Sequence, residues 1–258
     1  MKSNIIRGVC LAFVMLGGLL SLEKTSVAQT VDDEMQICKN SGLNIIIGTP
    51  NNDVINGTPG GDCIIALGGQ DIINAGDGND IVFGDDGDDV INGQGGDDQL
   101  QGGNGQDKID GGAGNDLVIG DDVFGPQSGD DELHGGVGDD EIFAGPGNDR
   151  LFGEAGNDLL IGDAGDDQVS GGDGNDEVFG GSGNDTLFGD AGDDVLSATG
   201  PAGPGEAGDD AINGGPGNDI LVDCIDHNRL NGNDGVDTCE FNALMSTAAS
   251  CENIIVCP

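Results

Sequence analysis

The sequence has no tryptophan and no tyrosine, and its 258 residues include only 8 phenylalanines. Large aromatic side chains normally supply much of the buried area of a globular core, so an ordinary globular core of this length is excluded. Basic residues are also scarce, with 7 lysines and arginines against 49 acidic residues and a formal net charge of −42. This balance repels nucleic acid and anionic membranes, so we expect no nucleic-acid partner, and it attracts cations.

High acidity with few aromatic residues is typical of disordered chains, but a regular repeat argues against disorder here. From Gly48 to Glu240 the chain runs in nine-residue frames that begin GTPNNDVIN, GTPGGDCII, ALGGQDIIN and AGDGNDIVF. Twenty frames can be counted, and two of them, 120–134 and 198–213, carry six and seven extra residues. Position six is aspartate in 19 frames and asparagine only at Asn228, and position eight is always apolar. A disordered acidic chain has no reason to keep this register.

The consensus GGxGxDxUx, in which U is an apolar residue, resembles the RTX or hemolysin-type calcium-binding repeat, and the resemblance covers residues 48–240. It implies an all-β fold, namely a right-handed parallel β-roll (a β-solenoid) with two parallel sheets. Two repeats would make one coil of 18 residues, so twenty repeats would give about ten coils. The insertions near 120–125 and 198–204 are expected to form loops, because the repeat returns to register after each of them.

Within each frame, the last three residues are expected to form a short strand and the first six a turn. Glycines at positions one, two and four permit backbone angles that a Cβ would block. Carbonyl oxygens and the aspartate carboxylate would then form a hard oxygen cage that suits Ca²⁺. The expected metal ligands are the position-six aspartates Asp53, Asp62, Asp71, Asp80, Asp89, Asp98, Asp107, Asp116, Asp131, Asp140, Asp149, Asp158, Asp167, Asp176, Asp185, Asp194, Asp210, Asp219 and Asp237.

Stacking makes the cation necessary. Two carboxylates about 5 Å apart on successive coils repel by roughly 3–4 kcal/mol at an effective dielectric of 20. The burial of one aliphatic side chain per repeat contributes only about 1.5–3 kcal/mol, and the ordering of so much glycine opposes folding. We therefore expect the calcium-free chain to be largely unfolded and calcium binding to be coupled to folding.

The two sheets are expected to differ on their outer faces. Alternate repeats lie on opposite sheets, and position nine is apolar in seven of ten even-numbered repeats but in only two of ten odd-numbered ones. The resulting apolar row is a candidate surface for a protein partner or a second copy of the chain. Alternatively, it reflects β-propensity on a solvated sheet, or the end segments fold over it. Its members are Ile65, Phe83, Ile119, Phe143, Ile161, Phe179 and Val222.

Residues 1–28 are typical of a cleaved signal peptide, with a basic start, a short apolar run and Ser26-Val27-Ala28 as a cleavage site. The apolar run is too short and too broken by glycine for a membrane anchor, so we expect a secreted chain with no transmembrane segment. Residues 29–47 and 241–258 are expected to cap the rod. Six cysteines remain after cleavage and can form up to three disulfides, of which only Cys38–Cys63 can form within the N-terminal end. Free buried thiols are the alternative.

Chemistry other than calcium binding finds little support in the sequence. His134 and His227 are the only histidines, and both are interpreted as surface substitutions. No nucleotide-binding loop, zinc spacing or catalytic triad order occurs, and neither end is long enough for a catalytic domain, so no enzyme is predicted. The expected role is structural or interaction-forming, with an adhesive or ligand-binding surface module or a non-catalytic partner of a secreted enzyme as alternatives. Position three is never threonine, which makes ice binding unlikely.

Overall fold

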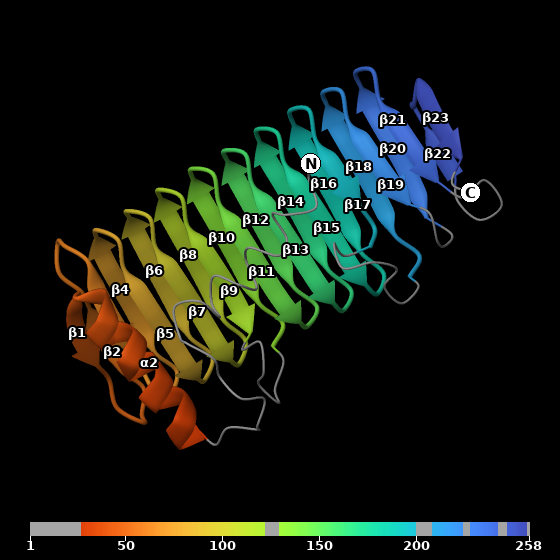
Figure 1. Ribbon diagram of the computed structural model, residues 1–258. Coiled ribbons are helices and arrows are strands. Elements are labelled where there is room, and N and C mark those ends of the chain that lie inside the picture. Colours follow the sequence, from red (N-terminus) through yellow and green to blue (C-terminus); the bar gives the residue numbers. More distant parts are fainter. Residues whose placement is uncertain (1–26, 122–128, 200–207, 224–227, 242–246, 257–258) are drawn as a thin grey trace.

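The computed structural model describes residues 27–121, 129–199, 208–223, 228–241 and 247–256. In these residues one helix, α2 (Val27–Ser41), precedes twenty-three strands that alternate between two parallel sheets. Coil follows coil along a straight rod, and the two chain ends of the solenoid lie at opposite ends of the rod (Figure 1). The expected all-β solenoid with two parallel sheets is confirmed.

Sheet A has twelve strands, contributed by the even-numbered repeats and by both ends. Its strands are β1 (Asn44–Ile47), β3 (Asp62–Ile65), β5 (Ile81–Asp86), β7 (Gln99–Asn104), β9 (Leu117–Asp121), β11 (Glu141–Pro146), β13 (Leu159–Ala164), β15 (Glu177–Ser182), β17 (Val195–Ser197), β19 (Ile220–Asp223), β21 (Thr238–Phe241) and β23 (Asn253–Val256).

Sheet B has eleven strands, contributed by the odd-numbered repeats and by one C-terminal strand. Its strands are β2 (Val54–Asn56), β4 (Ile72–Asp77), β6 (Val90–Gly95), β8 (Lys108–Ala113), β10 (Glu132–Val137), β12 (Arg150–Ala155), β14 (Gln168–Asp173), β16 (Thr186–Ala191), β18 (Ala211–Pro216), β20 (Arg229–Asp234) and β22 (Thr247–Ala249).

The strand pairing confirms the coil length. Within each sheet, residues 18 apart face each other, as Ile73 faces Ile91 in sheet B. The spacing grows to 24 residues where β8 pairs with β10, and to 25 where β16 pairs with β18. The six and seven extra residues therefore leave the register intact on both sides, although residues 122–128 and 200–207 themselves lie outside the described part of the chain.

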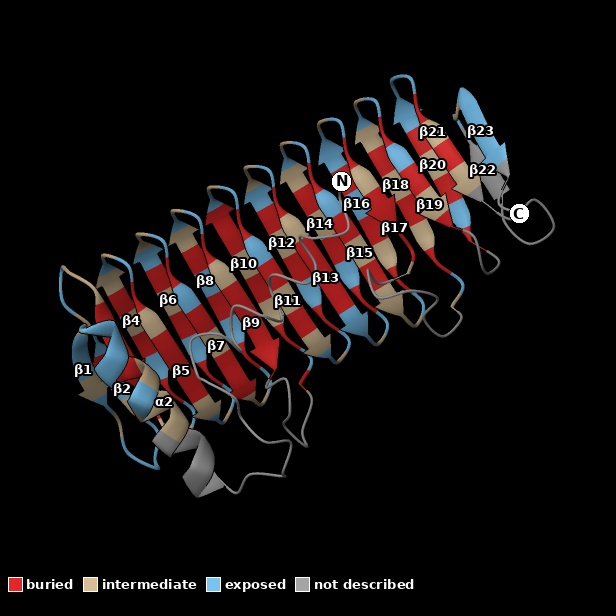
Figure 2. Ribbon diagram, viewed as in Figure 1, coloured by how far each residue is buried: buried red, intermediate tan, exposed pale blue. Residues whose placement is uncertain are grey.

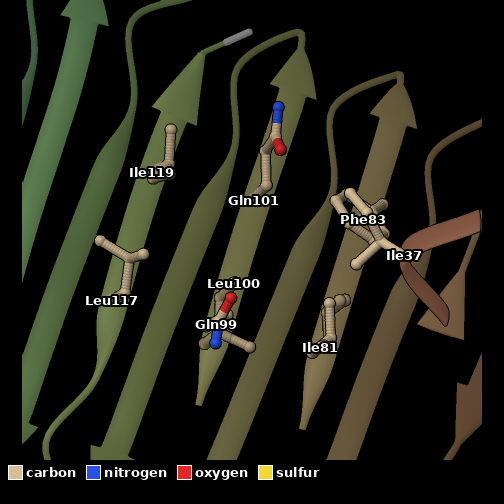
Figure 3. A pocket seen from close by; sticks show the side chains of 9 residues that line it. Ile37, Ile81, Phe83, Gln99, Leu100, Gln101, Leu117 and Ile119 are labelled. Carbon is tan, nitrogen blue, oxygen red and sulfur yellow. The ribbon is translucent and has the colours of Figure 1, made fainter. Parts of the chain in front are cut away.

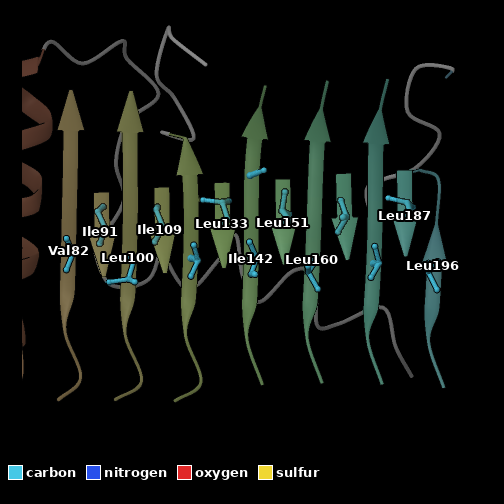
Figure 4. Close-up of a cluster of buried hydrophobic side chains, with 14 of the residues drawn as sticks. Val82, Ile91, Leu100, Ile109, Leu133, Ile142, Leu151, Leu160, Leu187 and Leu196 are labelled. Atoms are coloured by element: carbon cyan, nitrogen blue, oxygen red, sulfur yellow. The ribbon is translucent and has the colours of Figure 1, made fainter. Parts of the chain in front are cut away.

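The core is a double row of aliphatic side chains from position eight. Strands of the two sheets contribute in turn, as Val82, Ile91, Leu100 and Ile109 show in Figure 4. Nearly all of these side chains are completely buried, and the sheet interiors form a continuous buried layer between the exposed turns (Figure 2). Each such side chain contributes about 1.5–3 kcal/mol of hydrophobic stabilisation, and no aromatic side chain is needed to fill so narrow a core.

Most strands are six residues long rather than the three that the sequence predicted. They continue through positions one to three of the next repeat, as in β4, where Ile72-Ile73-Asn74 is followed by Ala75-Gly76-Asp77. The backbone can bend at position two because this residue takes a positive φ, even where it is not glycine, as at Gln94 (79°) and Glu154 (76°). The parallel pairing of β4 with β6 continues on both sides of this bend, from Asn74 with Asn92 to Gly76 with Gln94.

The sheets extend beyond the repeat region at both ends. Strand β1 pairs with β3, and β22 and β23 pair with β20 and β21, so strands form in segments that lack the consensus. At the N-terminal end, Cys38 of α2 is disulfide-bonded to Cys63 of β3, with Cα atoms 5.5 Å apart. Cys239 of β21 is bonded to Cys251 at the other end. Cys224 and Cys257 lie outside the described residues.

The apolar row forms on the outer face of sheet A. Ile65 faces Phe83, Ile119 faces Phe143, and Phe143 faces Ile161 on neighbouring strands, which confirms the expected alternation between the sheets. Ile65 and Phe83 are buried in a cluster to which Met35 and Ile37 of α2 contribute. A shallow apolar pocket beside Ile37 continues along the sheet toward Ile119 (Figure 3). The chain itself therefore covers the N-terminal part of the row, one of the alternatives that the sequence left open.

Candidate metal centres in the turns

The predicted ligands occupy equivalent places in the turns. Eighteen of the nineteen position-six aspartates are buried, and Asp53 is half-buried. Each lies where a turn enters its strand, so the aspartates of even repeats form one row along the rod and those of odd repeats form a second row. The burial of a carboxylate in repeat after repeat is unusual, because an ionised carboxylate is normally buried only with a partner.

One carboxylate oxygen of each aspartate has a structural partner. The backbone N–H of Asp80 donates to Oδ1 of Asp98 (2.8 Å), and the N–H of Asp98 donates to Oδ1 of Asp116 (2.8 Å). The same bond recurs from coil to coil, so each row of aspartates is a continuous hydrogen-bonded ladder. This ladder ties each turn to the next one along the rod.

Two residues outside the predicted set belong to these ladders. Asn228, the one exception at position six, accepts the N–H of Asp210 through its side-chain oxygen (2.7 Å). Glu252 accepts the N–H of Asp237 at 2.9 Å and so ends the ladder of sheet A. The position of Asn228 in the repeat already indicated its place in the ladder. Glu252 lies beyond the last of the twenty frames, so the repeat could not predict its role.

The second carboxylate oxygen has no protein partner in most turns. The Oδ2 atom is buried and unbonded in sixteen of the position-six aspartates. A buried, unsatisfied charged oxygen costs several kcal/mol in isolation, and its repetition in turn after turn points to a ligand. The sixteen are Asp71, Asp80, Asp89, Asp98, Asp107, Asp116, Asp131, Asp140, Asp149, Asp158, Asp167, Asp176, Asp185, Asp194, Asp219 and Asp237.

Position one of the same frame leaves room beside this oxygen. A Cβ added at Gly111 would lie 2.6 Å from Oδ2 of Asp116, and one added at Gly93 would lie 2.5 Å from Oδ2 of Asp98. Position one is glycine or alanine in every frame but one, and the exception is Asp223, whose frame carries Asn228 at position six. A small residue at position one thus accompanies an aspartate at position six throughout.

Burial makes these carboxylates resist ionisation. Removal from water raises the pKa of Asp107 to about 8 and that of Asp89 to about 7, and the neighbouring carboxylates of the ladder add to the effect. Hydrogen bonds from the ladder N–H groups act in the opposite direction but do not offset the burial. A bound cation would reverse this balance, because it stabilises the ionised form.

The donor set fits a hard cation. Among the described residues, no group of three acidic, histidine or cysteine side chains converges on one point. Each turn therefore offers one free carboxylate oxygen, and its remaining ligands would have to be backbone carbonyl oxygens or water. Oxygen-only ligation with carboxylate and carbonyl donors is the preference of Ca²⁺, so the sixteen turns fit this ion.

Three of the nineteen predicted ligands, Asp53, Asp62 and Asp210, are not in this set of sixteen. Asp210 keeps the ladder bond, since its Oδ1 accepts the N–H of Asp185 (2.8 Å), but its Oδ2 is not a free buried oxygen. Oδ2 of Asp53 accepts the N–H and the hydroxyl of Thr49, at 2.6 and 2.9 Å. Oδ2 of Asp62 accepts the same two groups of Thr58, at 2.5 and 2.9 Å. Oδ2 of Asp53 and Oδ2 of Asp62 are thus bonded to protein groups, so neither aspartate has a free oxygen for a cation.

A second set of ladders, missed from the sequence, runs along the outside of the turns. Position-five side chains accept the N–H of the position-five residue on the next coil, as Asp139 does from Asn157 (2.8 Å). The side-chain amide of Asn157 also donates to the same oxygen (3.0 Å). These bonds lower the pKa of Asp139. The recurrent Asn-Asp and Asp-Asp pairs at positions five and six are the sequence signal for the two ladders.

The outer face of sheet B carries the one described histidine. His134 stacks on Phe152, with ring centroids 4.7 Å apart, and lies beside Glu132 and Glu154. Lys108 and Arg150 also pair with Glu132. These groups lie on the sheet surface, away from the turns, as expected for surface substitutions, and His227 lies outside the described residues. No described helix has the length and apolarity needed to cross a membrane.

Comparison with known sequences matches the repeat region to one family. A sequence model of the RTX calcium-binding nonapeptide repeat matches residues 40–73, 47–82, 56–91, 65–100, 92–123, 127–160, 161–196 and 205–222. These matches together cover more than half of the chain. No curated protein sequence matches it.

Proposed function

Because the chain belongs to the family of RTX calcium-binding nonapeptide repeats, we propose that it is a secreted structural protein that folds by binding several Ca²⁺ ions in its turns. The observation that carries the proposal is the sixteen buried Oδ2 atoms without a protein partner, arranged in two rows along the rod. The proposed ligands are the aspartates that contribute these oxygens, together with carbonyl oxygens of the turns. Calcium would supply the positive charge that the stacked carboxylates lack.

Coupling of folding to binding follows from the electrostatics of the turns. Without a cation, winding the chain brings sixteen poorly solvated carboxylates into two close rows, which burial and mutual repulsion oppose. The hydrophobic core offers one aliphatic side chain per repeat against this cost. A ligand that binds only the wound form stabilises it by about 2.7 kcal/mol per site at a free concentration one hundred times Kd, so several sites together would decide the folding equilibrium.

Circular dichroism tests this proposal. In calcium the full chain should show strand content, and an excess of EDTA should remove most of it reversibly. Magnesium at the same concentration should restore little, since Mg²⁺ demands a tighter and more regular ligand geometry. Strand content that is unchanged by chelation would refute the coupling of folding to calcium.

Export is the second part of the proposal. Residues 1–28 would direct the chain out of the cell and be removed after Ala28, and a calcium concentration in the millimolar range outside the cell would then fill the turns. Amino-terminal sequencing of the exported protein should begin at Gln29. Retention of the chain inside the cell would contradict this part without affecting calcium binding.

The outer face of sheet A is the proposed interaction surface. Phe143, Phe179 and Val222 remain half-buried in the apolar row beyond α2, and Ile220 beside them is 43% exposed. A partner protein or a second copy of the chain is proposed to bind there, in keeping with a structural or adhesive role rather than catalysis. Light scattering in calcium tests self-association, and a strict monomer that binds no surface protein would contradict the idea.

A further inference from the structure

The first two turns of the solenoid are closed by protein groups instead of being open to a cation. In the turn 48–53 the hydroxyl and N–H of Thr49 bind Oδ2 of Asp53, and in the turn 57–62 those of Thr58 bind Oδ2 of Asp62. The other oxygen of Asp62 accepts the side-chain amide of Asn44 (2.5 Å). Asp62 is therefore fully satisfied without metal, although it is completely buried.

The backbone at position two explains why these two turns close. In the standard turns this residue has a positive φ, as at Leu67 (82°), Asp85 (71°) and Gly103 (111°). Thr49 and Thr58 do not take positive φ, in agreement with the strong resistance of β-branched residues to that region. With an ordinary φ, the N–H and hydroxyl of each threonine donate to the carboxylate. One further threonine, Thr199, lies at position two, in the frame 198–213 that carries seven extra residues.

The same end has a core of its own. Cys38 of α2 is bonded to Cys63 of β3, and both are completely buried with Ile65 and Phe83. Met35, Ile37 and Leu43 pack against this cluster. Strand β1 pairs with β3 through four residue pairs, so the closed turns lie within one complete coil.

From these observations we propose that residues 34–65, named here the N-terminal clamp, stay folded without calcium and template the winding of the remaining coils. The proposal rests on the calcium-coupled folding proposed above. The clamp presents the backbone edges of β2 and β3, to which β4 and β5 later bind. In a solenoid each repeat contacts only its neighbours, so an ordered first coil removes the costly nucleation step. Calcium would then fix the sixteen turns that have a free Oδ2, from Asp71 to Asp237.

Hydrogen–deuterium exchange on the full, disulfide-intact chain tests the clamp. In EDTA, amides of residues 44–65 should exchange at least about tenfold more slowly than those of residues 72–198, whereas in calcium both regions should be protected. Equal, fast exchange of both regions in EDTA would overturn the clamp while leaving calcium-coupled folding in place. Protection that is identical with and without calcium throughout the chain would instead refute the proposed function.

A threonine substitution tests the role of the closed turn directly. Thr58→Gly permits the positive φ of the standard turn and removes the hydroxyl, so the variant should lose protection of residues 44–65 in EDTA and bind one more Ca²⁺ per chain in calcium. Thr186→Gly is the matched control, because Thr186 is at position seven of its repeat, as the first residue of β16, and does not touch a position-six carboxylate. It should change neither the calcium count nor the protection of residues 44–65. Unchanged behaviour of Thr58→Gly in both assays would overturn the proposal.

Discussion

One oxygen of a position-six aspartate accepts a ladder hydrogen bond, and the other is proposed to bind the cation. The substitution Asp98→Asn distinguishes these two functions. Oδ1 of Asp98 holds the N–H of Asp80, whereas Oδ2 is buried and has no protein partner. An asparagine can keep the first interaction, as Asn228 does for Asp210, but it replaces the free carboxylate oxygen by an amide. The variant should therefore keep the ladder and lose the cation site.

The expected effects can be ranked. Loss of one site lowers the free energy of unfolding by about 2.7 kcal/mol at a free calcium concentration one hundred times Kd. Asp98→Ala loses the site and also leaves the buried N–H of Asp80 without an acceptor, which adds about 1–3 kcal/mol. In EDTA, Asp98→Asn should not reduce residual strand content, because it removes a buried charge from the ladder.

The assay is the number of Ca²⁺ ions bound per chain, measured by equilibrium dialysis, together with the urea midpoint at fixed free calcium. Asp97→Asn is the matched control, since it removes the same charge from the same turn at an exposed residue that accepts only the N–H of Asn115. Asp98→Asn should bind at least one ion fewer than the control. Equal calcium counts for the two variants, or an equal loss of stability for Asp98→Asn and Asp98→Ala, would refute the division of tasks.

Three further predictions concern pH, turn size and the apolar row. Burial raises the folded-state pKa of Asp107 to about 8 and of Asp89 to about 7, above the value of about 3.9 in an unfolded chain. The wound calcium-free form is therefore favoured at low pH and loses that stability as the pH rises through these values. Circular dichroism in EDTA should show more strand at pH 5 than at pH 9, and the opposite order would contradict this effect of burial. A Cβ at Gly111 would lie 2.6 Å from Oδ2 of Asp116 and 2.6 Å from the carbonyl oxygen of Gly135, so Gly111→Ala should lower the urea midpoint and the larger Gly111→Val should lower it further, at a cost of about 1–3 kcal/mol. Urea midpoints equal to that of the unaltered protein for both variants would contradict this. Phe143→Ser combined with Phe179→Ser should reduce self-association measured by light scattering. Phe188→Ser on sheet B, whose side chain is 37% exposed, should not.

The repeat made the architecture predictable. A strict nine-residue period with one apolar and one acidic position fixed the coil of 18 residues, the two sheets and the row that joins Ile65 to Val222. Insertions did not disturb these expectations because the register resumes at Asp131 and Asp210 with the same partners.

Individual hydrogen bonds and the elements outside the repeat could not be predicted from the nine-residue period. The consensus gives Asp53 and Asp98 the same role, and only the hydrogen bonds of Thr49 show that the Asp53 carboxylate is already satisfied. Strands β1 and β23 have no consensus to mark them, since their sequences NIII and NIIV join sheet A through backbone pairing with β3 and β21. Helix α2 is fixed by its disulfide and by packing against sheet A, which no local pattern signals.

The most direct test of the central claim is an anomalous difference map from crystals grown in calcium. Peaks should lie about 2.3–2.6 Å from Oδ2 of the sixteen aspartates in which this oxygen is free, and none should lie beside Asp53, Asp62 or Asn228. Turns without density at Oδ2, or cations bound only to exposed carboxylates such as Asp97, would contradict the account.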